Sequence, residues 1–155
     1  MESGACDALV LAFAGVHRLG YDHLMVQELP PQHFVPPAGQ GSITLEATNS
    51  LKDSTRDSIR DLVNHPESEL CIRAERSFLR TMQGGCSVPI FSLAHRDGKD
   101  LVLTAGIISL DGQEIISETV FSPEDPEILG EKLALKVLGK GGAKILEQVK
   151  SQLGN

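Results

Sequence analysis

A cysteine that follows two glycines is the residue of this chain best suited to covalent chemistry. Cys86 comes directly after Gly84 and Gly85, between an amphipathic helical segment and a β-rich segment. Glycine adopts the positive φ angles that end a helix, and it has no side chain to shield a neighbouring sulfur. A thiol in such a loop could carry a covalent cofactor. The alternative is a small buried thiol, because free cysteine is usually a core residue.

The residues around Cys86 form a longer pattern. Residues 73–90 read Arg-Ala-Glu-Arg-Ser-Phe-Leu-Arg-Thr-Met-Gln-Gly-Gly-Cys-Ser-Val-Pro-Ile. This segment closely resembles the cofactor-attachment region of the porphobilinogen deaminase family, also called hydroxymethylbilane synthase. Three further segments resemble that family in the same order: residues 7–20 ending in Arg-Leu-Gly, residues 36–46 with Gly39-Gln40-Gly41, and residues 101–112 ending in Ser-Leu-Asp-Gly. The chain is therefore similar to the C-terminal half of that enzyme.

The resemblance implies a covalent dipyrromethane cofactor, one per chain. In that family the cysteine matching Cys86 forms a thioether to the dipyrromethane, and Gly85 stands beside it. The enzyme couples four porphobilinogen units to the cofactor, releases ammonia each time, and then hydrolyses off hydroxymethylbilane. Arg18 matches an arginine that contacts cofactor or substrate carboxylates, and Gln40 matches a segment near the cleft. The family's acid-base aspartate lies in the first domain, which this chain lacks, so no catalytic residue is expected here.

Each of these positions also has a structural interpretation. Arg18 could be a solvated arginine near the negative end of a helix dipole. The glycines on either side of Gln40 are equally typical of an ordinary crossover turn. Three arginines recur at helical spacing before Cys86 and favour solvent or salt bridges over cofactor contacts: Arg73, Arg76 and Arg80. Cys71 lies in an apolar helical stripe and is interpreted as a core thiol.

The charge balance limits the partners that the chain can attract. Its 14 basic and 21 acidic residues give a net charge of -7, which argues against nonspecific binding to nucleic acid or to an anionic membrane. The apolar run at residues 8–16 is too short to span a bilayer. The 3 cysteines form no Cys-x-x-Cys pair and fit a reducing compartment, so a cytoplasmic protein is expected. The 5 histidines lack the spacing of metal ligands, and no metal site is expected.

Residues 50–155 have the pattern of an α+β unit. Three β-rich runs, residues 89–95, 101–110 and 114–121, are separated by Asp97-Gly98 and Asp111-Gly112, and these dipeptides predict hairpin turns. A three-stranded antiparallel sheet follows. Helices are predicted on one face of it, at residues 53–64, at residues 66–83, from an N-cap at Ser122 to Gly139, and at residues 143–153.

The first 49 residues read as an incomplete α/β segment. Residues 8–14 are apolar on both faces and predict a buried strand, followed by a short helix that Gly20 ends. Two proline pairs predict an extended crossover, and the alternation at residues 42–48 predicts a half-buried strand. With the resemblance, residues 1–49 are interpreted as the end of the second domain and the crossover to the first. Residues 50–155 are then the C-terminal cofactor-attachment domain.

Three functions are compatible with the sequence. The first is the C-terminal portion of a porphobilinogen deaminase, acting on the small molecule porphobilinogen and needing an N-terminal half. The second is a noncatalytic binding or interaction domain derived from that enzyme, because the acid-base aspartate is absent. The third is a thiol-dependent redox protein, disfavoured because Cys86 has no resolving cysteine nearby in sequence. The chain alone is expected to be inactive and, with residues 8–16 exposed, to self-associate.

Overall fold

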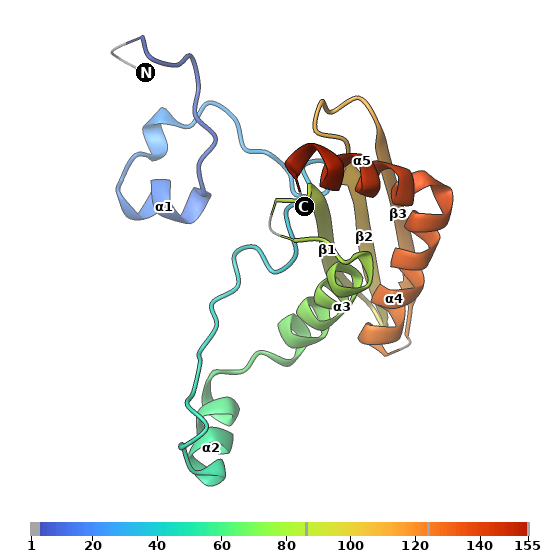
Figure 1. Cartoon of the computed structure of the whole chain (residues 1–155). Helices are drawn as coiled ribbons and strands as arrows, with labels where there is room; N and C mark the ends of the chain where they lie inside the picture. The colour runs from blue at the N-terminus through green and yellow to red at the C-terminus, as the bar shows by residue number, and fades with distance from the viewer. Residues whose placement is uncertain (1–3, 86, 124, 155) are drawn as a thin grey trace. The chain divides into compact units, whose positions relative to one another are not determined.

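The chain divides into two compact units. The structure is a computed structural model that describes residues 4–85, 87–123 and 125–154. The units are Met1–Phe34 and Val35–Asn155 (Figure 1), and each is described by itself. This boundary differs from the expected one after residue 49, but compactness does not test which residues belong to which domain of a longer protein. The expected domain boundary therefore stays a prediction.

The first unit holds two short helices and little buried surface. Helix α1 spans Phe13–Arg18, and the 3-10 helix η1 spans Asp22–Leu24. The strand predicted at residues 8–14 is wrong: no described residue there is in a strand, and the last two belong to α1. A strand exists only through hydrogen bonds to a neighbouring strand, and the described part of this unit contains none. The apolar side chains of the run, including Leu9, Val10 and Leu11, are exposed as expected.

The second unit is built on an antiparallel sheet. Strands β1 (Ile90–Asp97), β2 (Asp100–Ile108) and β3 (Ile115–Ser122) lie in the order β1-β2-β3. Ile90 pairs with Ile107 across the first hairpin, and Leu101 pairs with Ser122 across the second. Gly98 and Gly112 have φ angles of 59° and 72°, the left-handed values that the turn residues were expected to supply. The predicted three-stranded meander is confirmed.

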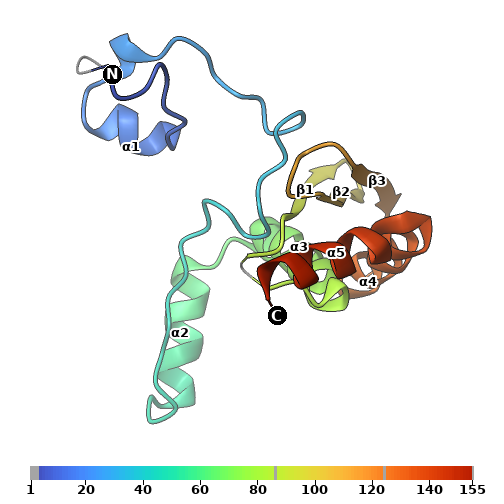
Figure 2. The ribbon, with the colours of Figure 1, turned by 45° about the horizontal axis from the view of Figure 1, so that its top comes forward.

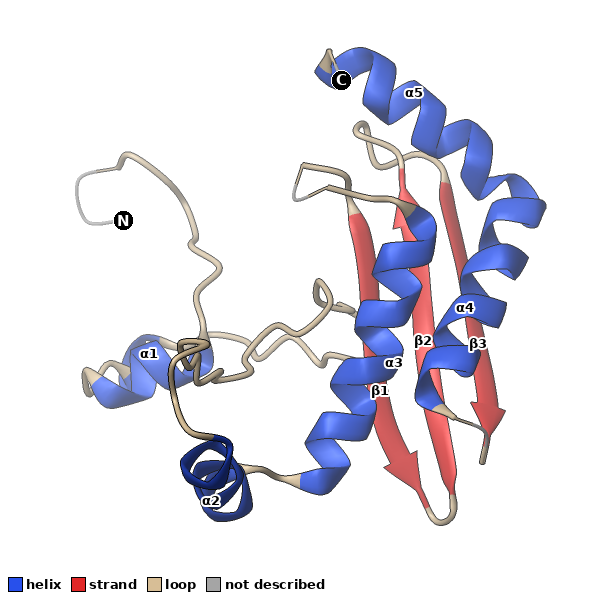
Figure 3. Ribbon diagram, turned by 60° about the horizontal axis from the view of Figure 1, so that its bottom comes forward, coloured by secondary structure: helices blue, strands red, loops and turns tan. Residues whose placement is uncertain are grey.

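Helices cover one face of this sheet. They are α3 (Pro66–Met82), α4 (Pro126–Val137) and α5 (Ala143–Leu153), with the π-helical segment η2 (Leu138–Gly142) between the last two. Helix α2 (Asp53–Val63) has no buried residue and does not contribute to this layer. Figures 2 and 3 show α3, α4 and α5 on the same side of the strands. The core between the layers includes Phe78 and Met82 of α3, Leu103 of β2 and Leu133 of α4. The α+β prediction, with helices on one face, is confirmed.

Two local predictions in the second unit are wrong. Residues 42–48 form no strand, because their alternation finds no partner strand among the described residues. Helix α4 starts at Pro126 and is capped by Asp125, whose side chain accepts from the N–H of Glu127 at 2.8 Å. Ser122, the predicted N-cap, is the last residue of β3 and pairs with Leu101. Pairing in the sheet therefore takes precedence over a local capping signal.

An ion cluster ties β3 to the helical layer. The carboxylate of Glu118 lies 2.7 Å from Nζ of Lys136 and also contacts Lys140. Hydrogen bonds from Lys136 and then Lys140 lower the pKa of Glu118 below its usual range. A lowered pKa means that the carboxylate stabilises the fold above its unfolded pKa, and that this stabilisation disappears as the pH falls through the folded pKa.

We therefore expect Glu118→Gln to reduce stability modestly at neutral pH and to leave it unchanged in acid. Chemical unfolding at several pH values measures the difference between wild type and variant. High salt should shrink that difference, because an exposed ion pair is screened. Glu131→Gln on the exposed face of α4 is the control. A Glu118 difference that persists at low pH would contradict the ionic interpretation.

Candidate functional site

The loop after α3 lies where the first two strands meet. The carbonyl of Pro89 accepts from the N–H of Ile108 at 3.1 Å, so the loop enters the sheet beside the end of β2. Within the loop, the N–H of Val88 donates to the carbonyl of Gly85 at 3.0 Å. Gly85 is exposed, and a Cβ built on it meets nothing within 4 Å. Cys86, the predicted attachment residue, lies outside the described residues.

The glycines of this loop do not play the role expected from the sequence. The residue that ends α3 in the left-handed conformation is Gln83, with φ 51°, whereas Gly84 and Gly85 have no positive φ. Gly84 instead packs closely on Ile90: a Cβ there would lie 2.1 Å from Cδ1 of Ile90, so the Ile90 side chain would have to shift. Gly84 therefore lies close against the core, whereas Gly85 has open space around it.

A second predicted segment is a tight turn at residues 39–41. Gly39 and Gly41 have φ angles of 74° and 83°, so both positions favour glycine. The N–H of Gln40 donates to the carbonyl of Pro37 at 3.1 Å, and the Gln40 residue is exposed. The backbone of the turn is therefore well defined, and Gln40 is accessible at its tip.

The predicted binding arginine belongs to the other unit. Arg18 is the last residue of α1 and is exposed, while Gln40 and Gly85 lie in the second unit. The structure describes the two units separately, so the assembly of Arg18, Gln40 and Gly85 with Cys86 into one site stays a prediction. The arginines of α3 behave as expected: Arg73 pairs with Glu127 of α4 at 3.3 Å, and Arg76 and Arg80 are exposed.

Sequence reasoning missed one polar residue, Glu75 of α3. It is only 5% exposed, and its two carboxylate oxygens accept from the backbone N–H groups of Gly39 and Ala94. The sequence does contain a signal for the burial of Glu75, because Glu75 follows Cys71 by four residues and precedes Phe78 by three. These are the spacings of the apolar stripe, and a carboxylate in such a stripe needs a buried partner.

Two cavities open on the second unit. One, of about 390 Å³, lies beside Glu75 and is lined by residues that include Cys71, His65, His95 and Arg96. Burial, and then the nearby Glu75 carboxylate, raise the pKa of the Cys71 thiol. Cys71 is half-buried and packs against the core, as predicted. A half-buried thiol with a raised pKa is a weaker nucleophile than an exposed thiol of ordinary pKa at neutral pH.

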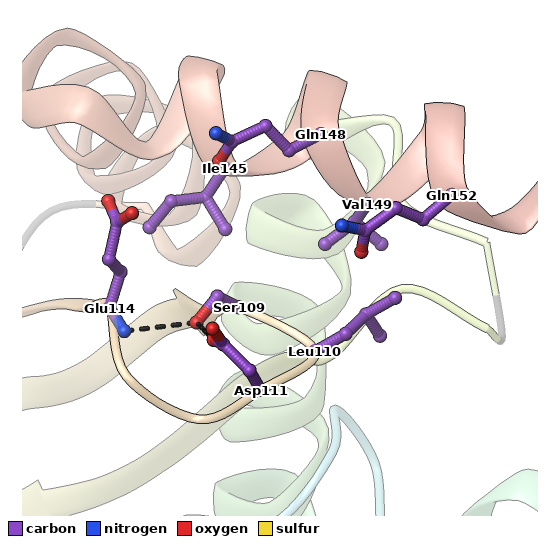
Figure 4. A pocket seen from close by; sticks show the side chains of 8 residues that line it. All are labelled: Ser109, Leu110, Asp111, Glu114, Ile145, Gln148, Val149 and Gln152. Atoms are coloured by element: carbon purple, nitrogen blue, oxygen red, sulfur yellow. Dashed lines mark hydrogen bonds between the residues drawn. The ribbon is translucent and has the colours of Figure 1, made fainter.

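The other cavity, of about 380 Å³, lies between α5 and the turn after β2 (Figure 4). Asp111 and Glu114 stand on one side of it, and Gln148 and Gln152 on the other. Asp111 already accepts from the Ser109 hydroxyl and the Gln113 N–H. Two carboxylates without a lining arginine do not complement an acidic ligand. Among the described residues, no group of histidine, cysteine or acidic side chains could hold a metal ion, and no helix is long and apolar enough to cross a membrane.

Comparisons with known proteins define the class to which this fold belongs. Residues 69–139 match the family described as "Porphobilinogen deaminase, C-terminal domain". Residues 1–56 match the one described as "Porphobilinogen deaminase, dipyromethane cofactor binding domain". The two matches follow each other along the chain and together cover most of it. The C-terminal match includes most of α3 and Cys86.

Individual relatives agree with these matches. The chain is 44% identical over 154 residues to a porphobilinogen deaminase of Cytophaga hutchinsonii, covering 99% of this chain and 49% of that protein. It is 42% identical over 153 residues to one of Desulfosudis oleivorans, covering 98% and 49%. The chain belongs to the porphobilinogen deaminase family. It spans about half the length of these relatives.

Proposed function

We propose that this chain is the C-terminal portion of a porphobilinogen deaminase, a transferase that polymerises porphobilinogen into hydroxymethylbilane for tetrapyrrole and haem biosynthesis. The observation that carries the proposal is the similarity along nearly the whole chain to relatives of that name. Supporting it, Cys86 falls in the C-terminal family match and directly follows the exposed Gly85. The part of the enzyme that this chain does not span would supply the acid-base aspartate.

Four residues are proposed to hold the dipyrromethane cofactor: Cys86, Gly85, Arg18 and Gln40. Cys86 would form the thioether, and the open surroundings of Gly85 are compatible with a bulky group on the next residue. Arg18 would bind cofactor or substrate carboxylates through its guanidinium fork, and Gln40 would offer its amide from the tip of the turn. When bound, the cofactor supplies the free pyrrole end to which substrate units are coupled. A covalent anchor makes each coupling a reaction within one complex, which lowers its entropic cost.

The partner would be the N-terminal half of the enzyme, supplied by the same protein or by another chain. The exposed apolar residues of the first unit, among them Leu9, Val10 and Leu11, support a need for such a partner or for self-association. The odd number of cysteines fits a reducing compartment better than a set of paired disulfides, which supports a cytoplasmic location.

A chimera tests the proposal. The part of the Cytophaga hutchinsonii relative that this chain does not cover is joined in front of it, and deaminase activity is measured as porphobilinogen consumption and ammonia release. The same chimera with Cys86→Ser is the control for attachment. The intact relative is the positive control.

An active chimera that loses activity with Cys86→Ser supports the proposal. A chimera that folds, as judged by cooperative unfolding, but consumes no porphobilinogen contradicts it. That second result would favour a noncatalytic domain derived from the enzyme.

A further inference from the structure

The outer edge of strand β1 in the second unit is hydrogen-bonded to the Glu75 side chain and to the backbone of Pro36. Strand β1 is an edge strand, so its outward N–H groups lack a neighbouring strand. The N–H of Ser92 donates instead to the carbonyl of Pro36 at 2.9 Å. The N–H of Ala94, the next outward group, donates to Oε1 of Glu75 at 2.8 Å. Both groups are therefore satisfied without a fourth strand.

The same carboxylate also holds the turn that follows Pro36. Oε2 of Glu75 accepts from the N–H of Gly39 at 2.7 Å. Residues 36 and 39 are thus tied to the sheet edge at two points, directly through Ser92 and indirectly through Glu75. Both ties lie just before the exposed Gln40 in the sequence.

Only an ionised acid fits this position well. Both partners of Glu75 are N–H donors, and a carboxylate can accept from both with separate oxygens. Glutamine of the same shape has one acceptor oxygen, and its amide would turn a donor towards the second N–H. Burial raises the pKa of Glu75, and the N–H groups of Ala94 and Gly39 oppose that shift by favouring the ion. A buried carboxylate is costly, so these two bonds are what stabilises it here.

We propose that Glu75 is a positioning residue that clamps the turn at residues 39–41 onto the edge of the sheet. The clamp is a property of the second unit and does not depend on the proposed function. One consequence does rest on that function: by fixing the turn, Glu75 would position Gln40 for the cofactor.

Hydrogen exchange read by mass spectrometry with residue-level fragmentation tests the clamp in the full chain. Glu75→Ala removes both acceptor oxygens and is expected to speed exchange at the amides of Gly39 and Ala94 by about 10-fold or more, because each amide loses one charge-assisted hydrogen bond. The amide of Leu103, in the central strand, reports global opening and should change by much less. Glu67→Ala, at an exposed acid in the first turn of α3, is the matched control and should change exchange at none of the three amides.

The proposal would be overturned if exchange at the Gly39 amide is unchanged in Glu75→Ala, or if it rises only by the same factor as exchange at the Leu103 amide. If the variant does not fold, hydrogen exchange of the wild-type chain alone still tests the clamp. The Gly39 amide should then exchange at least about 10-fold more slowly than in an unstructured peptide of residues 35–44. An unprotected Gly39 amide would refute the clamp, whatever the activity of the chimera.

Discussion

Replacing Gly130 by alanine is expected to lower the free energy of unfolding of the second unit by about 1 to 3 kcal/mol, the usual cost of overpacking a tight contact. Gly130 lies in α4 where that helix touches α3. A Cβ built there would be 2.4 Å from the carbonyl oxygen of Ala74 and 2.8 Å from the backbone nitrogen of Phe78. Both obstacles are backbone atoms of a helix, so they cannot rotate away and the helices must separate.

Separation of these helices would weaken the centre of the fold. Ser77 donates from its hydroxyl to the carbonyl of Glu127 at 2.7 Å, and Arg73 pairs with the side chain of Glu127. Phe78 is fully buried at the same interface. Alanine is the better helix former by about 1 kcal/mol, which offsets part of the loss but does not remove the clash.

Gly139→Ala provides the matched control for this prediction. Gly139 has no positive φ, and a Cβ there meets nothing within 4 Å. Its replacement should leave stability unchanged or raise it by up to about 1 kcal/mol. Denaturant unfolding of the two variants and the wild type measures both effects. Equal stability changes in the two variants would show that close helix packing at Gly130 is not the cause.

Replacing Cys86 by serine is expected to remove covalent cofactor attachment completely. The measurement is the intact mass of the chimera after expression with porphobilinogen available. If the proposed function is correct, the wild-type chimera carries one mass increment matching a dipyrromethane. The serine variant carries none, because a serine hydroxyl is a much weaker nucleophile than a thiolate and cannot form the thioether.

Cys71→Ser separates attachment at one cysteine from general thiol reactivity. Cys71 is half-buried and its pKa is raised, so its thiol stays protonated and its removal should leave the increment in place. An increment that persists in Cys86→Ser, or that disappears in Cys71→Ser, would show that the attachment residue is assigned wrongly. An unmodified wild-type chimera would remove the basis for the cofactor proposal.

Patterns among residues close together in the sequence were sufficient to predict the hairpins and most of the helices. Asp97-Gly98 and Asp111-Gly112 predicted two turns because positive φ angles there favour glycine, and both glycines have them. The apolar spacing of residues 66–83 predicted α3 to within one residue of its observed end. The same patterns failed at residues 8–14 and 42–48, because alternation or apolarity makes a strand only beside another strand.

What the sequence by itself determined is the family of this chain and its α+β class, whereas the role of Cys86 in covalent attachment stays a prediction. These follow from residue types at short spacing, which local physics and a resemblance can interpret. Tertiary structure alone decided that Ser122 ends a strand instead of capping a helix, and that Gly130 must lack a side chain. It also decided that the Glu75 carboxylate accepts hydrogen bonds from Gly39, 36 residues away, and from Ala94, 19 residues away. Such contacts depend on which segments the folded core brings together, and no local pattern specifies that.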